Sequence, residues 1–159
     1  MNPARLREAD EPSRDAPLAP FSASRSSRYQ APRRQPLVLI ADDTADVRDL
    51  YSMYLTSRGF RVLTAQDGAV AIQTALDHRP DVIVMDLAMP QLDGITAAQR
   101  IKANAGTRQT RVILLTGYPN YAIERDARER GIDRFLTKPC LPEELERHVN
   151  ELGGSAPPR

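Results

Sequence analysis

The fold is decided by the stretch 82–90, which reads Val-Ile-Val-Met-Asp-Leu-Ala-Met-Pro. Four apolar residues run without a break up to Asp86, and a short loop with Pro90 follows. An unbroken and largely β-branched run of this kind is typical of a strand buried on both faces, as in the parallel sheets of α/β proteins. Because open α/β sheets bind their ligands beyond the carboxyl ends of the strands, Asp86 stands where a functional site is expected.

Four more apolar runs lie on either side of this stretch, and helical patterns separate them. Thr44 is expected to cap the first helix and Gly59 to stop it. Strands are expected at residues 37–41, 61–65, 82–86, 112–116 and 133–138, and helices at 45–58, 69–78, 94–104, 121–130 and 142–152. This alternation predicts an α/β fold with a doubly wound, five-stranded parallel sheet and five helices on its two faces.

The composition is that of one folded domain with a tail: 159 residues, 41% of them hydrophobic and 27% charged. A net charge of +1 excludes a strong overall attraction to nucleic acid or to a membrane. The sequence has no run of roughly 20 apolar residues that could span a bilayer, and no secretory signal. The single cysteine, Cys140, cannot form an internal disulfide and is expected to pack beside the last helix. These features favour a cytoplasmic location. His78 and His148 lie far apart, so no zinc site is expected.

Residues 1–36 are expected to form a disordered tail rich in Pro, Ser and Arg. The tail contains seven Arg and four acidic residues and so carries a charge of about +3. It could act as a weak electrostatic arm for an acidic partner, but a solvated extension is favoured because the charges are mixed. The folded domain is expected at 37–152, and residues 153–159 are expected to be frayed.

Polar residues stand at the ends of four of the predicted strands, where a functional site would form. They are Asp42 and Asp43, Asp86, Thr116 and Lys138. In a parallel sheet these strand ends lie along one edge, so the three carboxylates converge and repel one another unless a cation lies among them. Oxygen ligands favour Mg²⁺. A lysine, a hydroxyl and Mg²⁺ around one carboxylate form a pocket for a phosphoryl group.

These motifs resemble the receiver domain of bacterial response regulators, a flavodoxin-like fold, over about Leu37 to Leu152. The resemblance rests on four segments in order: Asp42-Asp43, 86–94 (Asp-Leu-Ala-Met-Pro-Gln-Leu-Asp-Gly), 115–117 (Leu-Thr-Gly) and 135–139 (Phe-Leu-Thr-Lys-Pro). Each residue alone has an ordinary structural explanation, such as a helix cap, a strand threonine or a solvated lysine. Their joint occurrence at several strand ends favours the functional interpretation.

The resemblance implies a metal and phosphoryl site. Asp86 would accept a phosphoryl group from a sensor histidine kinase, a phosphotransfer protein or a small phosphodonor. Asp43, Asp86 and the backbone carbonyl of Ala88 would ligate Mg²⁺ directly, and Asp42 would hold the ion through water. No other cofactor is implied.

The resemblance also implies a switch. Lys138 would pair with the phosphoryl oxygens, Thr116 would swing its hydroxyl toward them, and Phe135 would move behind Thr116. Pro139 would follow a cis peptide bond. The lifetime of the phosphoryl group on Asp86 is not decided by the sequence. The small side chain of Ala88 would let water reach the group, whereas Tyr118 would shield it.

The surface formed by residues 121–130, 133–138 and 142–152 would carry the signal to a downstream protein partner. Its mixed charges suit either a homodimer contact or a plain solvated surface. No helix-turn-helix follows Leu152, so the chain is expected to be a stand-alone receiver without a DNA-binding domain. A truncated DNA-binding regulator is less favoured.

An aspartate-nucleophile phosphohydrolase is the main alternative. Such enzymes need a second Asp two residues after the nucleophile, and that position is Ala88. A signalling protein that modifies only itself, without turning over a substrate, is therefore favoured over an enzyme.

Overall fold

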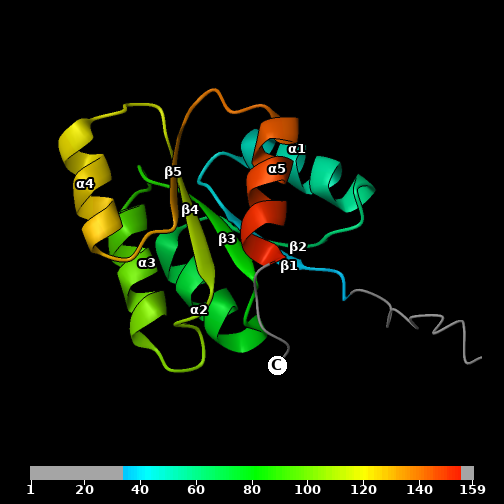
Figure 1. Ribbon diagram of the computed structural model, residues 1–159, viewed down its shortest axis with the longest axis horizontal. Coiled ribbons are helices and arrows are strands. Elements are labelled where there is room, and N and C mark those ends of the chain that lie inside the picture. Colours follow the sequence, from blue (N-terminus) through cyan, green and yellow to red (C-terminus); the bar gives the residue numbers. More distant parts are fainter. Residues whose placement is uncertain (1–33, 155–159) are drawn as a thin grey trace, which may run out of the picture. The chain divides into compact units, whose positions relative to one another are not determined.

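Residues 34–154 are described by a computed structural model, in which five strands and five helices alternate (Figure 1). The tail predicted for residues 1–36 lies outside the described residues up to residue 33, as does the predicted frayed end from residue 155. The strands are β1 (Leu37–Ala41), β2 (Arg61–Ala65), β3 (Val82–Asp86), β4 (Arg111–Thr116) and β5 (Arg134–Thr137). The helices are α1 (Ala45–Ser57), α2 (Gly68–His78), α3 (Gly94–Ala103), α4 (Tyr121–Glu129) and α5 (Pro142–Gly153).

The five strands form one parallel sheet in the order β2-β1-β3-β4-β5. Every residue of β1 and β3 is buried, and β4 is buried from Val112 to Thr116. The outer strands β2 and β5 are partly exposed. The predicted doubly wound fold is confirmed. The unbroken apolar runs of the sequence form the inner strands β1, β3 and β4, because these strands are covered on both faces.

Helices cover the two faces of the sheet unequally. Side chains of α2, α3 and α4 pack on one face against strand residues that include Leu39 and Leu114. On the other face, Tyr51 of α1 and Leu145 of α5 pack around Val84. Figure 1 shows α3 and α4 on one side of β4 and β5, with α1 and α5 on the other. Among the helices of residues 34–154, none is long and apolar enough to cross a membrane.

The predicted helix boundaries agree with the structure to within one or two residues, but the start of α1 differs in its chemistry. Thr44 occupies the capping position, yet its side chain makes no capping hydrogen bond. The Thr44 N–H instead donates to the carboxylate of Asp42 at 2.9 Å. Gly59 follows the helix with a φ of +91°, as expected for a glycine stop.

Strand β5 is shorter than the predicted 133–138. Its pairing with β4 runs from Arg134 to Thr137, and the flanking residues Asp133 and Lys138 each donate one further backbone hydrogen bond to β4. The ladder ends here because Pro139 has no N–H to donate. The Lys138–Pro139 peptide bond is cis, as expected.

Cys140 is buried beside α5, as predicted. It lies in the apolar cluster that contains Leu145 and Val149, and its carbonyl accepts a hydrogen bond from the Tyr51 hydroxyl at 2.8 Å. Burial, together with nearby Glu144, raises the pKa of the thiol to about 11. The thiol is therefore protonated at neutral pH and is a poor nucleophile.

Two carboxylates hold the amino-terminal edge of the sheet, and the first is Asp81. It is 6% exposed and immediately precedes β3. It accepts hydrogen bonds from the Leu37 N–H at 2.8 Å and from the Arg34 guanidinium at 2.6 Å. This carboxylate thus ties the start of β1 to the start of β3.

Asp133 performs the same role between β4 and β5. It accepts hydrogen bonds from the Val112 N–H at 2.8 Å, from Lys102 at 2.7 Å and from Arg111 at 2.9 Å. Burial is the largest influence on its pKa and raises it. The bonds from Lys102, Val112 and Arg111 together outweigh burial and lower the pKa below the ordinary value of 3.8.

We expect Asp133→Asn to reduce the free energy of unfolding by about 2 kcal/mol at pH 7. A carboxyl with a lowered pKa stabilises the fold above its ordinary pKa and loses this contribution as the pH falls through the lowered value. The difference between variant and wild type should therefore shrink below about pH 4. Urea unfolding at a series of pH values measures it, and a constant difference down to about pH 2 would contradict the assignment.

Candidate functional site

The carboxyl-terminal edge of the sheet collects the polar residues that the sequence places at strand ends. Asp42 follows β1, Asp86 ends β3, Thr116 ends β4 and Lys138 follows β5. Asp42, Asp86 and Thr116 are buried at 2%, 6% and 2% exposure, whereas Asp43 is exposed. Asp42, Asp86 and Thr116 therefore form the buried part of the site, and Asp43 lies at its solvent-exposed side.

The three carboxylates form a compact cluster. One oxygen from each of Asp42, Asp43 and Asp86 lies within 4.8 Å of the others. Lys138 Nζ is 2.9 Å from Asp42 Oδ2 and 3.3 Å from Asp86 Oδ1. The cluster thus places three carboxyl groups around a single lysine ammonium. Hard oxygen ligands in this arrangement suit a divalent cation such as Mg²⁺.

The charges of the cluster disturb two pKa values. Burial, assisted by the charge of Asp42, raises the pKa of Asp86, although Lys138 and the Ala88 N–H act in the opposite direction. Burial alone would lower the pKa of Lys138, but its pairs with Asp42 and Asp86 outweigh burial and raise it. The lysine therefore stays protonated, and the ionised form of Asp86 would be favoured by additional positive charge beside it.

The loop between β3 and α3 lies tightly against Asp86. The Gly94 N–H donates to the Leu87 carbonyl at 2.9 Å, and Asp93 caps α3 by accepting from the Thr96 N–H at 3.0 Å. A Cβ at position 94 would lie only 2.4 Å from the backbone oxygen of Asp86. In the sequence, Asp93 and Gly94 end the segment 86–94 that carries the family resemblance, but no local pattern reveals this close approach.

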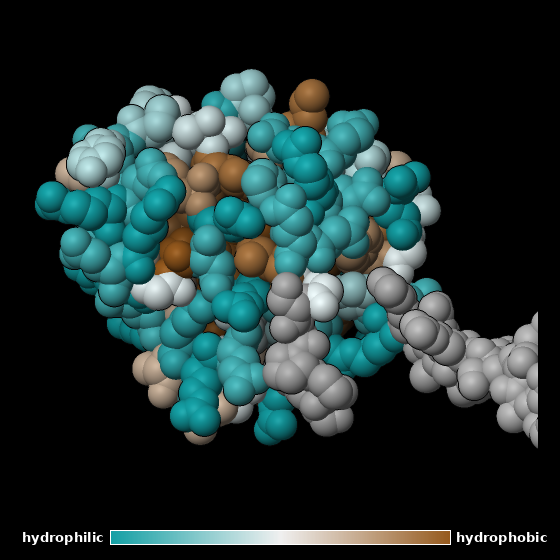
Figure 2. All heavy atoms as spheres, in the orientation of Figure 1, coloured by the Kyte–Doolittle hydropathy of each residue, from teal (hydrophilic) through white to brown (hydrophobic). Residues whose placement is uncertain are grey.

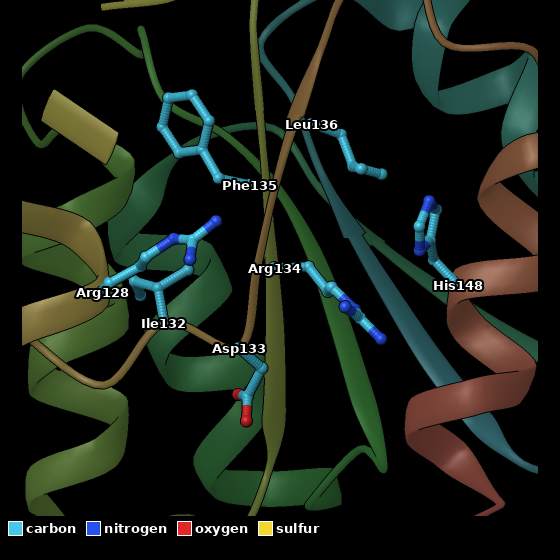
Figure 3. Close-up of a pocket in the computed structure, with 7 residues that line it drawn as sticks. All are labelled: Arg128, Ile132, Asp133, Arg134, Phe135, Leu136 and His148. Atoms are coloured by element: carbon cyan, nitrogen blue, oxygen red, sulfur yellow. The ribbon is translucent and has the colours of Figure 1, made fainter. Parts of the chain in front are cut away.

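Thr116 ends β4, and its side chain faces the loop that follows β4. Its Oγ1 accepts a hydrogen bond from the Tyr118 N–H at 3.1 Å. Tyr118 itself is 84% exposed. Phe135 is half-buried and pairs in register with Leu114, two residues before Thr116 on β4. Figure 3 shows the Phe135 ring pointing toward α4, while Leu136 points toward α5.

One residue at the site has no sequence signal. Arg48, on α1, donates a hydrogen bond from Nη1 to the backbone carbonyl of Asp42 at 2.7 Å. A basic residue on an amphipathic helix is normally part of the solvated surface, and the sequence does not show that the Arg48 side chain reaches back to the strand end.

Comparison with known proteins identifies the family. Residues 38–150 match the response regulator receiver domain. The chain belongs to this family. It is therefore a phosphoacceptor module of two-component signalling, and such receiver domains are generally signalling modules rather than enzymes.

The relatives of this receiver differ in length. The chemotaxis protein CheY of Bacillus subtilis is 33% identical over 115 residues, which cover 72% of this chain and 94% of CheY. The probable transcriptional regulator ycf27 of Guillardia theta is 35% identical over 115 residues, covering 72% of this chain but 44% of ycf27. The chain thus spans about half the length of such transcriptional regulators.

A solved structure supports the same assignment. The receiver domain of the sensor histidine kinase PA1611 from Pseudomonas aeruginosa PAO1 has a TM-score of 0.70 and 30% identity, covering 76% of this chain and 99% of that domain. A magnesium ion is coordinated in its active-site cleft.

We expect Gly94→Ala to lower the free energy of unfolding by roughly 3 kcal/mol, because the new methyl group would overlap the Asp86 carbonyl. Gly117→Ala is the matched control, since a Cβ at position 117 meets nothing within 4 Å. Thermal unfolding of both variants measures the effect. Equal midpoints for the two variants would show that the loop can move away from Asp86 at little cost.

Proposed function

We propose that Asp86 is the residue that accepts the phosphoryl group. The supporting observation is its place in the site: a buried carboxylate at the end of β3, 3.3 Å from Lys138 Nζ and clustered with Asp42 and Asp43. A carboxylate oxygen of Asp86 attacks the phosphorus of the donor. The bond from phosphorus to the donor atom breaks, and its electron pair leaves with the donor.

The acidic cluster, Asp86 included, would hold Mg²⁺. Asp43, Asp86 and the backbone carbonyl of Ala88 are the proposed direct ligands, and Asp42 binds through water. When bound, the ion supplies positive charge for the oxygens of the transferred group. Lys138 already lies between Asp42 and Asp86, and it needs only a small movement to pair with a phosphoryl oxygen on Asp86.

The switch begins with the hydroxyl of Thr116. We infer that it exchanges its hydrogen bond from the Tyr118 N–H for one to the phosphoryl group, which draws the loop after β4 toward Asp86. Phe135 then moves into the space behind Thr116. Because Phe135 contacts the α4 side of the sheet, this movement changes the surface formed by α4, β5 and α5.

This α4-β5-α5 surface has the form of a docking site. A groove of about 250 Å³ lies between α4 and α5 and is lined by residues 128, 132–136 and 148. Figure 2 shows apolar atoms at the bottom of a recess, flanked by hydrophilic side chains. The charges of α4 are paired within the helix, Arg128 with Glu124 and Arg130 with Asp126, both at 2.7 Å. The apolar floor is therefore the better basis for recognition.

We propose the partners from membership of the receiver family. A sensor histidine kinase or a phosphotransfer protein supplies the phosphoryl group in the cytoplasm. A downstream protein, or a second copy of this chain, binds the α4-β5-α5 surface after phosphorylation.

Incubation with Mg²⁺ and acetyl phosphate tests the assignment of Asp86. We expect the mass of the protein to rise by one phosphoryl group, in an adduct that is stable to acid and labile to base. Asp86→Asn should abolish labelling, and chelation of Mg²⁺ should reduce it. Asp93→Asn is the control because it removes a nearby carboxylate but leaves a capping oxygen. Equal labelling of Asp86→Asn would refute the proposal, and multiple turnover of phosphate monoesters would favour a phosphohydrolase.

Sedimentation velocity of the labelled protein tests the docking surface. Where a second copy of the chain is the partner, labelling produces a dimer, and Leu136→Asn, which makes the groove floor polar, raises the dimer dissociation constant by roughly tenfold or more; a labelled protein that stays monomeric leaves the downstream protein as the partner. Leu50→Asn is the matched control, because Leu50 is an exposed leucine on α1. Both variants should still be labelled. A dimer of Leu136→Asn as stable as that of Leu50→Asn would place the contact elsewhere.

A further inference from the structure

The turn between β1 and α1 carries Asp42 and Asp43, two of the three acidic residues of the cluster. Each of the three oxygen atoms of Asp42 accepts a hydrogen bond. Its Oδ1 accepts from the Thr44 N–H at 2.9 Å, and its Oδ2 accepts from Lys138 at 2.9 Å. Its backbone carbonyl accepts from Arg48 Nη1 at 2.7 Å. The Asp42 N–H donates to the Ala65 carbonyl of β2 at 3.1 Å, and Arg48 is the partner of the Asp42 carbonyl.

The Asp42 carbonyl belongs to the peptide group that joins Asp42 to Asp43. Rotation of this group would change the direction in which Asp43 leaves the chain. Within residues 34–154, no hydrogen bond or ion pair holds the exposed Asp43 carboxylate, so the backbone is what fixes the point from which this side chain starts. Arg48 also donates its own backbone N–H to the Thr44 carbonyl at 3.2 Å. Arg48 therefore donates hydrogen bonds to the carbonyl groups of both Asp42 and Thr44, one on each side of the turn.

We propose that Arg48 is a positioning residue for the cation site. By holding the peptide group between the two acids, it directs the Asp43 carboxylate toward Asp42 and Asp86 before any cation arrives. This inference rests on the proposed function, in which the acidic cluster holds a divalent cation. Arg48 is not a ligand, because a guanidinium has no acceptor to offer.

The charge of Arg48 has the opposite effect on cation binding. A guanidinium near the carboxylates repels a divalent cation, so loss of its charge alone would tighten binding. Loss of a positioning hydrogen bond would weaken binding, because Asp43 would have to be ordered at the expense of binding free energy. The sign of the change in affinity therefore separates the two roles.

Calorimetric titration with Mg²⁺ measures this sign. Arg48→Met keeps the aliphatic stem but removes both the donor and the charge, and we expect it to weaken Mg²⁺ binding about tenfold. Arg48→Lys keeps a donor and the charge and should stay within about threefold of the wild type. Arg100→Ala, which removes an exposed arginine of α3, is the control for net charge and should leave the affinity unchanged. Binding by Arg48→Met that is as tight as wild type, or tighter, would overturn the proposal.

A second measurement needs no metal. Amide NMR spectra in the presence of a chelator should show shifted signals for Asp43 and Thr44 in Arg48→Met and nearly native signals in Arg48→Lys. Unchanged Asp43 and Thr44 signals in Arg48→Met would overturn the positioning role even if the wild type takes up no Mg²⁺. Failure of the wild type to bind Mg²⁺ would instead refute the proposed cation site, so the two failures are distinguishable.

Discussion

The crowding of three carboxyl groups at the carboxyl-terminal edge of the sheet is the constraint on which the site depends. Asp42, Asp43 and Asp86 lie within 4.8 Å of one another, and Lys138 is the ammonium between two of them. Burial raises the pKa of Asp86 and makes its ionised form costly. A site of this kind gains free energy from an added cation.

The opposite edge of the sheet shows why the same residue type behaves differently there. Amino ends of parallel strands present free N–H groups, and Asp81 and Asp133 use them: Asp81 binds the Leu37 N–H, and Asp133 binds the Val112 N–H. Carboxyl ends present carbonyl oxygens, which cannot donate to a carboxylate. The acids at the amino edge bind a strand N–H as well as basic side chains, whereas at the carboxyl edge Asp42 and Asp86 share the ammonium of Lys138.

The fold was predictable from sequence because each strand and helix is specified by residues that are close together in the chain. The buried strands β1, β3 and β4 appear as unbroken apolar runs, and polar residues mark their ends. The directions of side chains and peptide groups were not predictable. Thr44 has the chemistry of a capping residue, but the Asp42 carboxylate takes its N–H. Gly94 is recognisable as a turn residue, yet its main constraint is the Asp86 carbonyl 2.4 Å from its missing Cβ. Arg48 acts through a peptide group six positions earlier in the chain, which no periodic pattern reports.

The ion pairs along α4 have a mechanical consequence. Within α4, Ala127 is the fully buried residue and Ile123 is partly buried, so the helix holds to the sheet through little apolar area. Its charged side chains are paired with one another at i and i+4, and these pairs move with the helix. Displacement of α4 therefore costs a small amount of apolar burial and the hydrogen bond from Arg130 to Gln99 of α3, and it breaks none of these pairs. The helix can move as one unit with its ion pairs intact.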